Sequence, residues 1–411
     1  MTATVQDALP DLDIMSPDAI ADPQGYFANL RATRPVHWDP RYRSWLITSH
    51  RHVIAALRDE RFSSNRIEPY ITKKLSGPDA DPLVRQAFEV LSGWMVFKEE
   101  PAHHRLRMLC SLAFTPASIA ALRTRVEVLC DSLIDAASAR PAFDLLRTIA
   151  NPLTSTVIAE MLGVPVEDRP RFERWTLDVQ PLVSTGLDDP NRYEGIARGM
   201  DSLVRYFAGQ IERYRAEPAD NLISALVRAN ADQDRLSDAE LMATCTLLLF
   251  GGQETTANLI ANSVLALLRH PEQRALLCGG QVDIKTALEE FMRYEGPGKT
   301  VIRVAREDFE FGGQRLRAGQ RVFLMLSVAN RDPEAFEEPE RLKLDRGAVR
   351  HVGFGLGSHF CLGAPLARLE AGAAIPRIVE RFPNLRLATE ALQWLPFIST
   401  RGLREMNVVA G

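Results

Sequence analysis

The stretch FGLGSHFCLG, residues 354–363, constrains the fold more than any other part of the chain. It places Cys361 at the end of a glycine-rich loop and directly before a predicted helix over residues 364–370. Glycines let the backbone pass close to a flat object in conformations that a side chain would forbid. A helix that begins just after the cysteine points its free N–H groups and positive dipole end at the sulfur. We therefore expect a lowered thiol pKa and a thiolate, the form that binds metal.

A soft thiolate on a glycine platform is typical of an axial ligand to haem iron. The pattern F-G-x-G-x-H-x-C-L-G resembles the cysteine-ligand loop of the cytochrome P-450 family. A buried structural cysteine is the alternative, but seven defined positions within ten residues favour the ligand. The resemblance implies that Cys361 binds the iron of haem b, and that Phe354, His359 and Gly363 contact the haem.

The resemblance covers residues 7–409 and implies a mainly α fold with a minor β component, in which a long central helix lies over the buried haem. The composition, with 46% hydrophobic and 25% charged residues, is that of an ordinary globular protein. No linker or repeat divides the chain, so we expect a single domain over residues 1–411 with no fused reductase. A net charge of −4 gives no reason to expect nucleic acid as a partner.

The five cysteines are scattered and lack C-x-x-C spacing, which argues for a reducing compartment and against disulfides or a zinc site. Residues 1–22 carry five acidic and no basic residues and no long apolar run. They are therefore predicted to be neither a signal peptide nor a membrane anchor. We expect a cytoplasmic protein that does not bind a membrane.

The pattern along the chain predicts helices for most of the polypeptide. Apolar residues recur at helical spacing almost throughout residues 116–270, and further helices are predicted over residues 26–33 and 285–294. Short strands are predicted from β-type runs and turn signals. The predicted strands are residues 35–38, 44–48, 301–304, 309–311, 320–324, 385–387 and 405–409.

The longest predicted helix begins at a capping box, with Ser237 as the N-cap and Glu240 three residues on, and runs through residues 241–268. In its middle stands GGQETT, residues 251–256. Two adjacent glycines cost about 1 kcal/mol each in a helix interior, and a charge in an apolar stretch costs more. A close helix crossing is the structural alternative, but together with Cys361 the pattern favours a functional site.

This segment resembles the G-x-[DE]-T oxygen-activation motif of the family. The resemblance implies that Gly251 lets haem and dioxygen approach the backbone. Thr255 would hydrogen-bond the dioxygen or an ordered water, and Glu254 would relay protons from solvent.

Buried haem propionates need cationic partners. His103 and Arg107 lie one helical turn apart in PAHHRLR, which resembles the family's P-x-H-x-R-x-R stretch. Arg303 matches the family's arginine on a strand beside the haem, and His359 precedes the ligand loop cysteine by two residues. We expect these four side chains to bind the propionates.

Glu290 and Arg293 match the family's E-x-x-R pair, and Arg341 is expected to complete a three-residue structural network. The substrate pocket is expected from residues 67–96, 177–193, 247–255, 297–302 and 395–400. Its apolar members are Leu182, Val183, Leu248, Val301, Ile302, Phe397 and Ile398. Lys299 could pair with a substrate carboxylate, but we expect it to face solvent.

The resemblance implies a monooxygenase that inserts one oxygen atom from O2 into a small, largely apolar substrate. Electrons would come from a ferredoxin and its ferredoxin reductase, so that NAD(P)H acts only indirectly. The ferredoxin is expected to dock on a basic patch formed by Arg105, Lys343, Arg346, Arg350 and Arg368. Three alternatives stay open: desaturation or oxidative coupling, peroxide-driven oxidation, and a haem-thiolate sensor without turnover.

Overall fold

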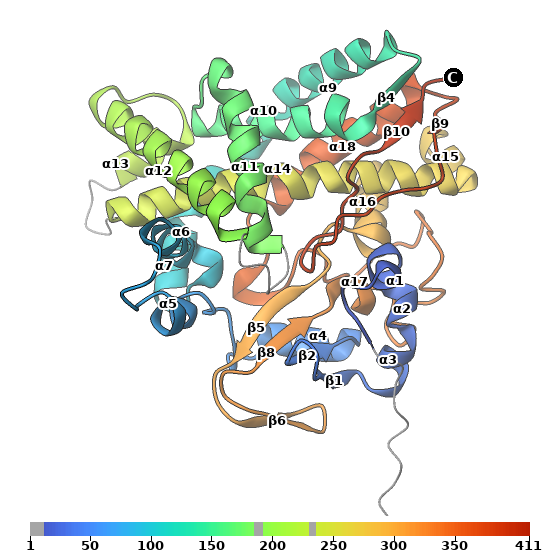
Figure 1. Ribbon diagram of the computed structural model, residues 1–411. Helices are drawn as coiled ribbons and strands as arrows, with labels where there is room; N and C mark the ends of the chain where they lie inside the picture. The colour runs from blue at the N-terminus through green and yellow to red at the C-terminus, as the bar shows by residue number, and fades with distance from the viewer. Residues whose placement is uncertain (1–11, 185–191, 230–235) are drawn as a thin grey trace, which may run out of the picture.

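The computed structural model describes residues 12–184, 192–229 and 236–411. A thick layer of helices lies above a small twisted sheet, and both parts combine segments from distant points of the chain (Figure 1). The predicted mainly α fold with a minor β component is thereby confirmed. Residues 1–11 of the predicted N-terminal segment, and residues 185–191 of a predicted pocket segment, lie outside the described residues.

One long helix organises the molecule. Helix α14, Asp238–Arg269, has 32 residues, which corresponds to about 48 Å at 1.5 Å per residue. Its predicted capping box is confirmed, because Ser237 and Glu240 bond to each other's backbone N–H groups. In Figure 1 this helix crosses the whole width of the molecule, with α10 (Asn151–Leu162) and α18 (Ala364–Arg381) packed against it.

The largest sheet has the strand order β1-β2-β8-β5-β3. Only the pair β2–β8 is parallel, and the other neighbours are antiparallel. Its members are β1 (Val36–Asp39), β2 (Ser44–Ile47), β3 (Phe62–Ser63), β5 (Val301–Ala305) and β8 (Arg321–Leu324). A three-stranded sheet contains β4 (Ala142–Asp144), β10 (Asn407–Val409) and β9 (Arg386–Leu387), and β6 (Phe309–Phe311) pairs with β7 (Gln314–Leu316).

The remaining helices cover these sheets and α14. In the N-terminal half they are α1 (Pro17–Ala21), α2 (Pro23–Tyr26), α3 (Ala28–Thr33), α4 (His50–Arg58), α5 (Glu68–Lys74), α6 (Pro82–Ser92), α7 (Ala102–Ser111), α8 (Pro116–Ala121) and α9 (Arg123–Ser138). Further on they are α11 (Arg169–Ser184), α12 (Arg192–Ala216), α13 (Leu222–Ala229), α15 (Pro271–Cys278), α16 (Ile284–Glu295) and α17 (Leu326–Ala329).

All seven predicted strands are present, within two residues of their expected ends. Three short strands were missed, namely β3, β4 and β7. Each has two or three residues and exists because a partner strand is in place to bond it. The helix predicted over residues 26–33 is divided at Phe27 into α2 and α3, and the helix after Cys361 is longer than predicted.

Candidate active site

The glycine-rich loop folds back on itself so that its two ends meet. The N–H of Cys361 donates to the carbonyl of Phe354 at 2.9 Å. Gly355 and Gly357 have φ values of +71° and +73°, in the left-handed region that a side chain disfavours. Helix α18 begins at Ala364, with Gly363 as its N-cap. The loop therefore presents the half-buried cysteine at the first turn of a helix, as predicted.

The expected lowering of the thiol pKa is wrong for this protein chain taken alone. Burial raises the pKa of Cys361, and this effect exceeds the opposite one of hydrogen bonds from the N–H groups of Gly363 and Ala364 and of the nearby Arg107. The free energy needed to remove a thiolate from water exceeds the stabilisation that a helix N-terminus provides. A metal ion deprotonates a coordinating thiol, so a raised pKa in the protein chain alone is compatible with a thiolate ligand.

The two glycines in the middle of α14 have different surroundings. Gly252 faces α10, and a Cβ there would lie 2.9 Å from the Ile158 side chain. Gly251 is exposed in the middle of a largely buried helix, and a Cβ there would have no atom within 4 Å among those described. The alternative of a close helix crossing therefore applies to Gly252, whereas Gly251 borders open space.

Thr255 lies one turn beyond Gly251 and on the same face of α14. Its hydroxyl donates to the carbonyl of Gly251 at 3.0 Å. Because the proton is used in this bond, the oxygen offers its lone pairs to a donor in the open space. Glu254 accepts a long hydrogen bond of 3.4 Å from the amide of Asn258. The motif thus supplies an acceptor oxygen and a carboxylate side by side.

The predicted propionate ligands come together from three elements. The rings of His103 on α7 and His359 in the loop lie 4.1 Å apart between centroids. His103 is 2% exposed, and its Nε2 has no hydrogen-bond partner among the described residues. Burial together with the neighbouring Arg303, His103 and Arg107 lowers the pKa of His359 to about 3.

Arg303 is 9% exposed and its guanidinium bonds only to the carbonyl of Ile302 in the described structure, so burial lowers its pKa to about 10. Arg107 donates to the carbonyl of Phe360 at 2.7 Å and so also supports the ligand loop. A buried guanidinium and an orphaned imidazole nitrogen fit a bound group that carries carboxylates.

Sequence reasoning missed two residues in this region. Ser64 approaches His359 with 3.3 Å between Oγ and Nε2, and it also donates to the carboxylate of Glu99 at 2.9 Å. Burial alone would raise the pKa of Glu99, but hydrogen bonds from Ser63, Ser64 and Asn65 lower it. No sequence pattern marks these residues, because the contact of Ser64 with His359 joins segments almost 300 positions apart.

The Glu290 network forms, but with a different third member. Glu290 and Arg293 are fully buried and form a two-bond ion pair at 2.7 and 2.8 Å. The other cation is Arg346, whose Nε lies 3.0 Å from Glu290. The predicted Arg341 instead pairs at the surface with Glu338 at 2.6 Å, and contributes only its backbone carbonyl to Arg293. The prediction failed because the loop turns Arg341 outward.

The expectation that Lys299 faces solvent is also wrong. Its side chain is buried at 4% exposure, and Nζ donates to the carbonyl of Phe397 at 3.4 Å. Burial lowers the pKa of Lys299 to about 8, and Arg401 contributes to this shift. The amine is therefore partly neutral near pH 8.

The predicted basic patch is largely neutralised by carboxylates. Arg105 pairs with Glu240, and Lys343 pairs with Glu338. Two further members are also engaged, since Arg346 binds Glu290 and Arg368 binds Glu289. Arg350 alone of the five is exposed and lacks a carboxylate partner among the described residues.

Comparison with known proteins accounts for this arrangement. The sequence profile of the cytochrome P-450 family matches residues 68–277 and 284–389. The chain belongs to the cytochrome P-450 family.

The similarity to individual P-450s extends over almost the whole chain. It is 34% identical over 395 residues to the biotin biosynthesis cytochrome P-450 of Bacillus subtilis (strain 168), covering 96% of this chain and 97% of that protein. It is 40% identical over 374 residues to cytochrome P-450 107B1 of Saccharopolyspora erythraea, covering 90% and 89%. A solved P-450 in complex with an acyl carrier protein ligated with hexadec-9Z-enoic acid has a TM-score of 0.88 at 33% identity, covering 96% of this chain and 100% of that chain.

This P-450 is therefore a haem-dependent monooxygenase of a family that acts on small molecules with electrons from redox partners. Other relatives are named as a vitamin D(3) 25-hydroxylase and a 6-deoxyerythronolide B hydroxylase. Within the described parts of the chain, no helix combines the length and the apolar character needed to span a membrane.

Proposed function

We propose that the chain inserts one oxygen atom from O2 into a small, largely apolar substrate, using haem b ligated by Cys361. The observation that carries this proposal is the open space beside Gly251 on α14, the helix against which the cysteine-capped α18 packs. Bound haem supplies the reductive activation of O2: substrate, O2, two protons and two electrons give hydroxylated substrate and water.

The protein contributes hydrogen-bond donors and positive charge for the haem carboxylates. Arg303, His103 and His359 provide donors for the two haem carboxylates, and Arg107 holds the loop backbone next to the ligand. Phe354 and Gly363 mark the two ends of the loop that supports the haem face. A haem carboxylate beside His359 would also raise the low pKa of this imidazole, because an opposite charge favours its protonated form.

Thr255 and Glu254 have different roles in proton transfer. The Thr255 oxygen, whose own proton is donated to Gly251, accepts a hydrogen bond from a protonated group in the space. The Glu254 carboxylate on the adjacent position passes protons inward from solvent. Together they direct protons to the oxygen atom that leaves as water.

Electrons come, on this proposal, from NAD(P)H through a ferredoxin reductase and a ferredoxin. Phe360, next to Cys361, and Met108 are large exposed apolar side chains that suit such a docking face, together with the cation of Arg350. Five free cysteines support a reducing cytoplasmic location. We further propose that residues 1–411 act as one domain.

The ligand assignment is tested by the optical spectrum of the ferrous carbonyl complex. The holo-protein should give the thiolate type of spectrum. Cys361→Ser should lose that spectrum, whereas Cys278→Ser, at an exposed thiol, should retain it. A thiolate spectrum in the Cys361→Ser variant contradicts the assignment.

The oxygen-activation role is tested with Thr255→Ala. This variant should bind haem normally but divert reducing equivalents to peroxide, because the acceptor oxygen beside the open space is gone. The ratio of product formed to NADH consumed measures the effect, with Thr256→Ala, a buried neighbour, as the control. Tight coupling in Thr255→Ala is incompatible with the proposed role.

A further inference from the structure

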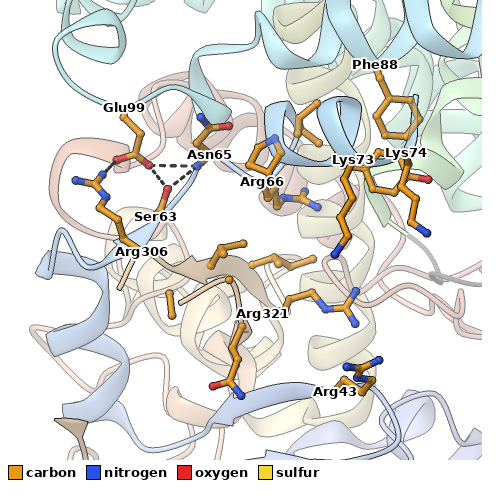
Figure 2. A pocket seen from close by; sticks show the side chains of 18 of the residues that line it. Arg43, Ser63, Asn65, Arg66, Lys73, Lys74, Phe88, Glu99, Arg306 and Arg321 are labelled. Atoms are coloured by element: carbon orange, nitrogen blue, oxygen red, sulfur yellow. Dashed lines mark hydrogen bonds and ion pairs between the residues drawn. The ribbon is translucent and has the colours of Figure 1, made fainter. Parts of the chain in front are cut away.

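A large cavity lies between helix α5 and the five-stranded sheet. Its volume is about 1260 Å³, and it opens to solvent. Its floor includes Ile302 and Val304 on β5, and it is also lined by Glu100, which contacts His103, so it adjoins the candidate haem site. Figure 2 shows this space with basic side chains directed toward it from several elements.

The charge of the cavity is opposite to that of the whole chain. The chain carries a net charge of −4, yet six cationic residues and two acidic residues line this space. The cationic residues are Arg43, Arg66, Lys73, Lys74, Arg306 and Arg321. Of the two acids, Glu99 is paired with Arg306, and Glu100 bonds to His103. The acids therefore do not neutralise the cations on the side of α5.

We call Arg43, Arg66, Lys73, Lys74 and Arg321 the cationic mouth. The first four have no carboxylate partner among the described residues. Arg321 bonds to neutral oxygens, the Ser44 hydroxyl at 2.8 Å and the Tyr42 carbonyl at 2.6 Å. Burial together with Arg303 and Arg321 lowers the pKa of Arg66 to about 10. Because Arg43, Arg66, Lys73 and Lys74 line one cavity and have no counter-charge among the described residues, their mutual repulsion favours an anionic ligand.

The other wall of the cavity is apolar and aromatic. Tyr70 on α5 stacks on Phe88 of α6 at 4.9 Å between ring centroids. The hydroxyls of Tyr70 and Tyr193 lie 2.9 Å apart, which joins α5 to α12. Ile67 and Ile398 complete this wall. All five residues belong to segments in which the sequence predicted the substrate pocket, so the cavity coincides with part of that predicted pocket.

We propose that the substrate is an anionic amphiphile, an apolar chain that ends in a carboxylate. Its charged end binds at the cationic mouth, and its chain lies along the aromatic wall toward the haem. The inference rests on the proposed function because the cavity has to lead to the same reaction site. The haem carboxylates do not account for the mouth, since Arg43, Lys73 and Lys74 are exposed on the solvent side of the cavity.

The test measures the binding of matched ligands to the ferric holo-protein by isothermal calorimetry. Dodecanoate should bind about ten times more tightly than dodecan-1-ol. A tenfold difference in Kd is what one partly desolvated ion pair is expected to contribute. Added salt should weaken the binding of dodecanoate but not that of the alcohol. Dodecyl phosphate separates two sources of the anion: tighter binding than dodecanoate would indicate a phosphate-bearing substrate, and weaker binding a free acid.

The double variant Lys73→Ala/Lys74→Ala should raise the Kd for dodecanoate about tenfold and leave that for dodecan-1-ol unchanged. Arg140→Ala/Lys285→Ala is the matched control, because it removes two exposed cations that do not line the cavity. Arg43→Gln should act in the same direction as the lysine variant. These side chains have no partner among the described residues to lose, so folding should be unaffected.

Equal affinities for the acid and the alcohol would overturn the inference, as would an equal effect of the control variant. The result is independent of the proposed function, because calorimetry needs no change in the haem spectrum. Loss of the thiolate carbonyl spectrum in the same preparation would remove the proposed function. A preference for the acid would still assign the anion site.

Discussion

Two arginine-rich regions of the molecule differ in how their positive charges are balanced. In the Glu290 network, Arg293 and Arg346 converge on one buried carboxylate, and the remaining donors of Arg293 bind backbone carbonyls. In the cationic mouth, a cavity is lined by Arg66, Lys73 and Lys74. None of these three cations has a carboxylate partner among the described residues.

The difference separates structural from ligand-binding charge. A buried ion pair with all its bonds formed holds segments together, and removal of one partner leaves an uncompensated charge. Arg43, Lys73 and Lys74 in the mouth have no carboxylate partner among the described residues, so their removal breaks no ion pair in the free protein. We therefore expect substitutions in the network to change stability and substitutions in the mouth to change binding.

The largest effect should follow Glu290→Ala. It leaves Arg293 and Arg346 without their shared carboxylate, and should reduce the free energy of unfolding by about 3–5 kcal/mol. Stable haem incorporation should be lost. Urea denaturation and haem content measure this, with Glu338→Ala, an acid that pairs only at the surface, as the control. A well-folded holo-variant with normal stability would refute the structural role.

The next largest effect is the contribution of Glu289 to the pH dependence of the free energy of unfolding. Glu289 pairs with His351 and Arg368 beside the network. Burial alone would raise the pKa of Glu289, but these two partners lower it from 4.5 to about 2. Since the folded-state pKa is depressed, the stabilisation is present above pH 4.5 and is lost as the pH falls toward 2. It amounts to roughly 3 kcal/mol at most.

The Glu289→Gln variant should therefore have a lower free energy of unfolding than the parent protein at pH 7. This difference in unfolding free energy, the gap, should narrow as the pH falls below 4.5. Denaturant unfolding at a series of pH values measures the gap. Glu380→Gln, at an exposed position of α18, serves as the control. A gap that does not change with pH would argue against the ion pairs as its cause.

A smaller effect distinguishes the two candidate third members of the network. Arg346→Ala should cost about 2–3 kcal/mol, because a hydrogen-bonded charge pair at a buried carboxylate is lost. Arg341→Ala should cost less than about 0.5 kcal/mol, because it removes only an exposed ion pair. Equal losses of unfolding free energy in the two variants would restore the original prediction of Arg341.

The smallest effect on stability is expected in the mouth. The triple variant Arg43→Gln/Lys73→Ala/Lys74→Ala should change the free energy of unfolding by less than about 0.5 kcal/mol, or stabilise the protein slightly by relieving repulsion. Chemical denaturation without ligand measures this. A loss of several kcal/mol would mean that these cations have a structural role, which would remove the contrast with the Glu290 network.

Much of the fold could be predicted because its signals are local. The capping box at Ser237, the long apolar run of α14 and the turn glycines each act within a few residues. The short strands β3 and β4 could not be predicted, since only a partner strand distant in the chain gives them their hydrogen bonds. Strand β7 pairs with the adjacent β6 across Gly312 and Gly313, so its signal was local and was missed.

For the candidate site, the sequence identified the residue types but not all of their surroundings. His103 and His359 lie together as expected, but the approach of Ser64 to His359 had no signal. Lys299 was expected in solvent and is buried, because the side-chain direction depends on how the loop packs against residues near Phe397.

The sequence by itself determined the family, the ligand loop around Cys361 and the helix that faces it, because these depend on short motifs with fixed spacing. Only the tertiary structure decided that Arg346 completes the network and that burial raises the pKa of the Cys361 thiol in the protein chain alone. It also brought together the cations of the mouth, which come from the β1–β2 and β3–α5 connections, from α5 and from β8. Charge balance and burial depend on which distant segments meet, and a one-dimensional pattern does not contain that information.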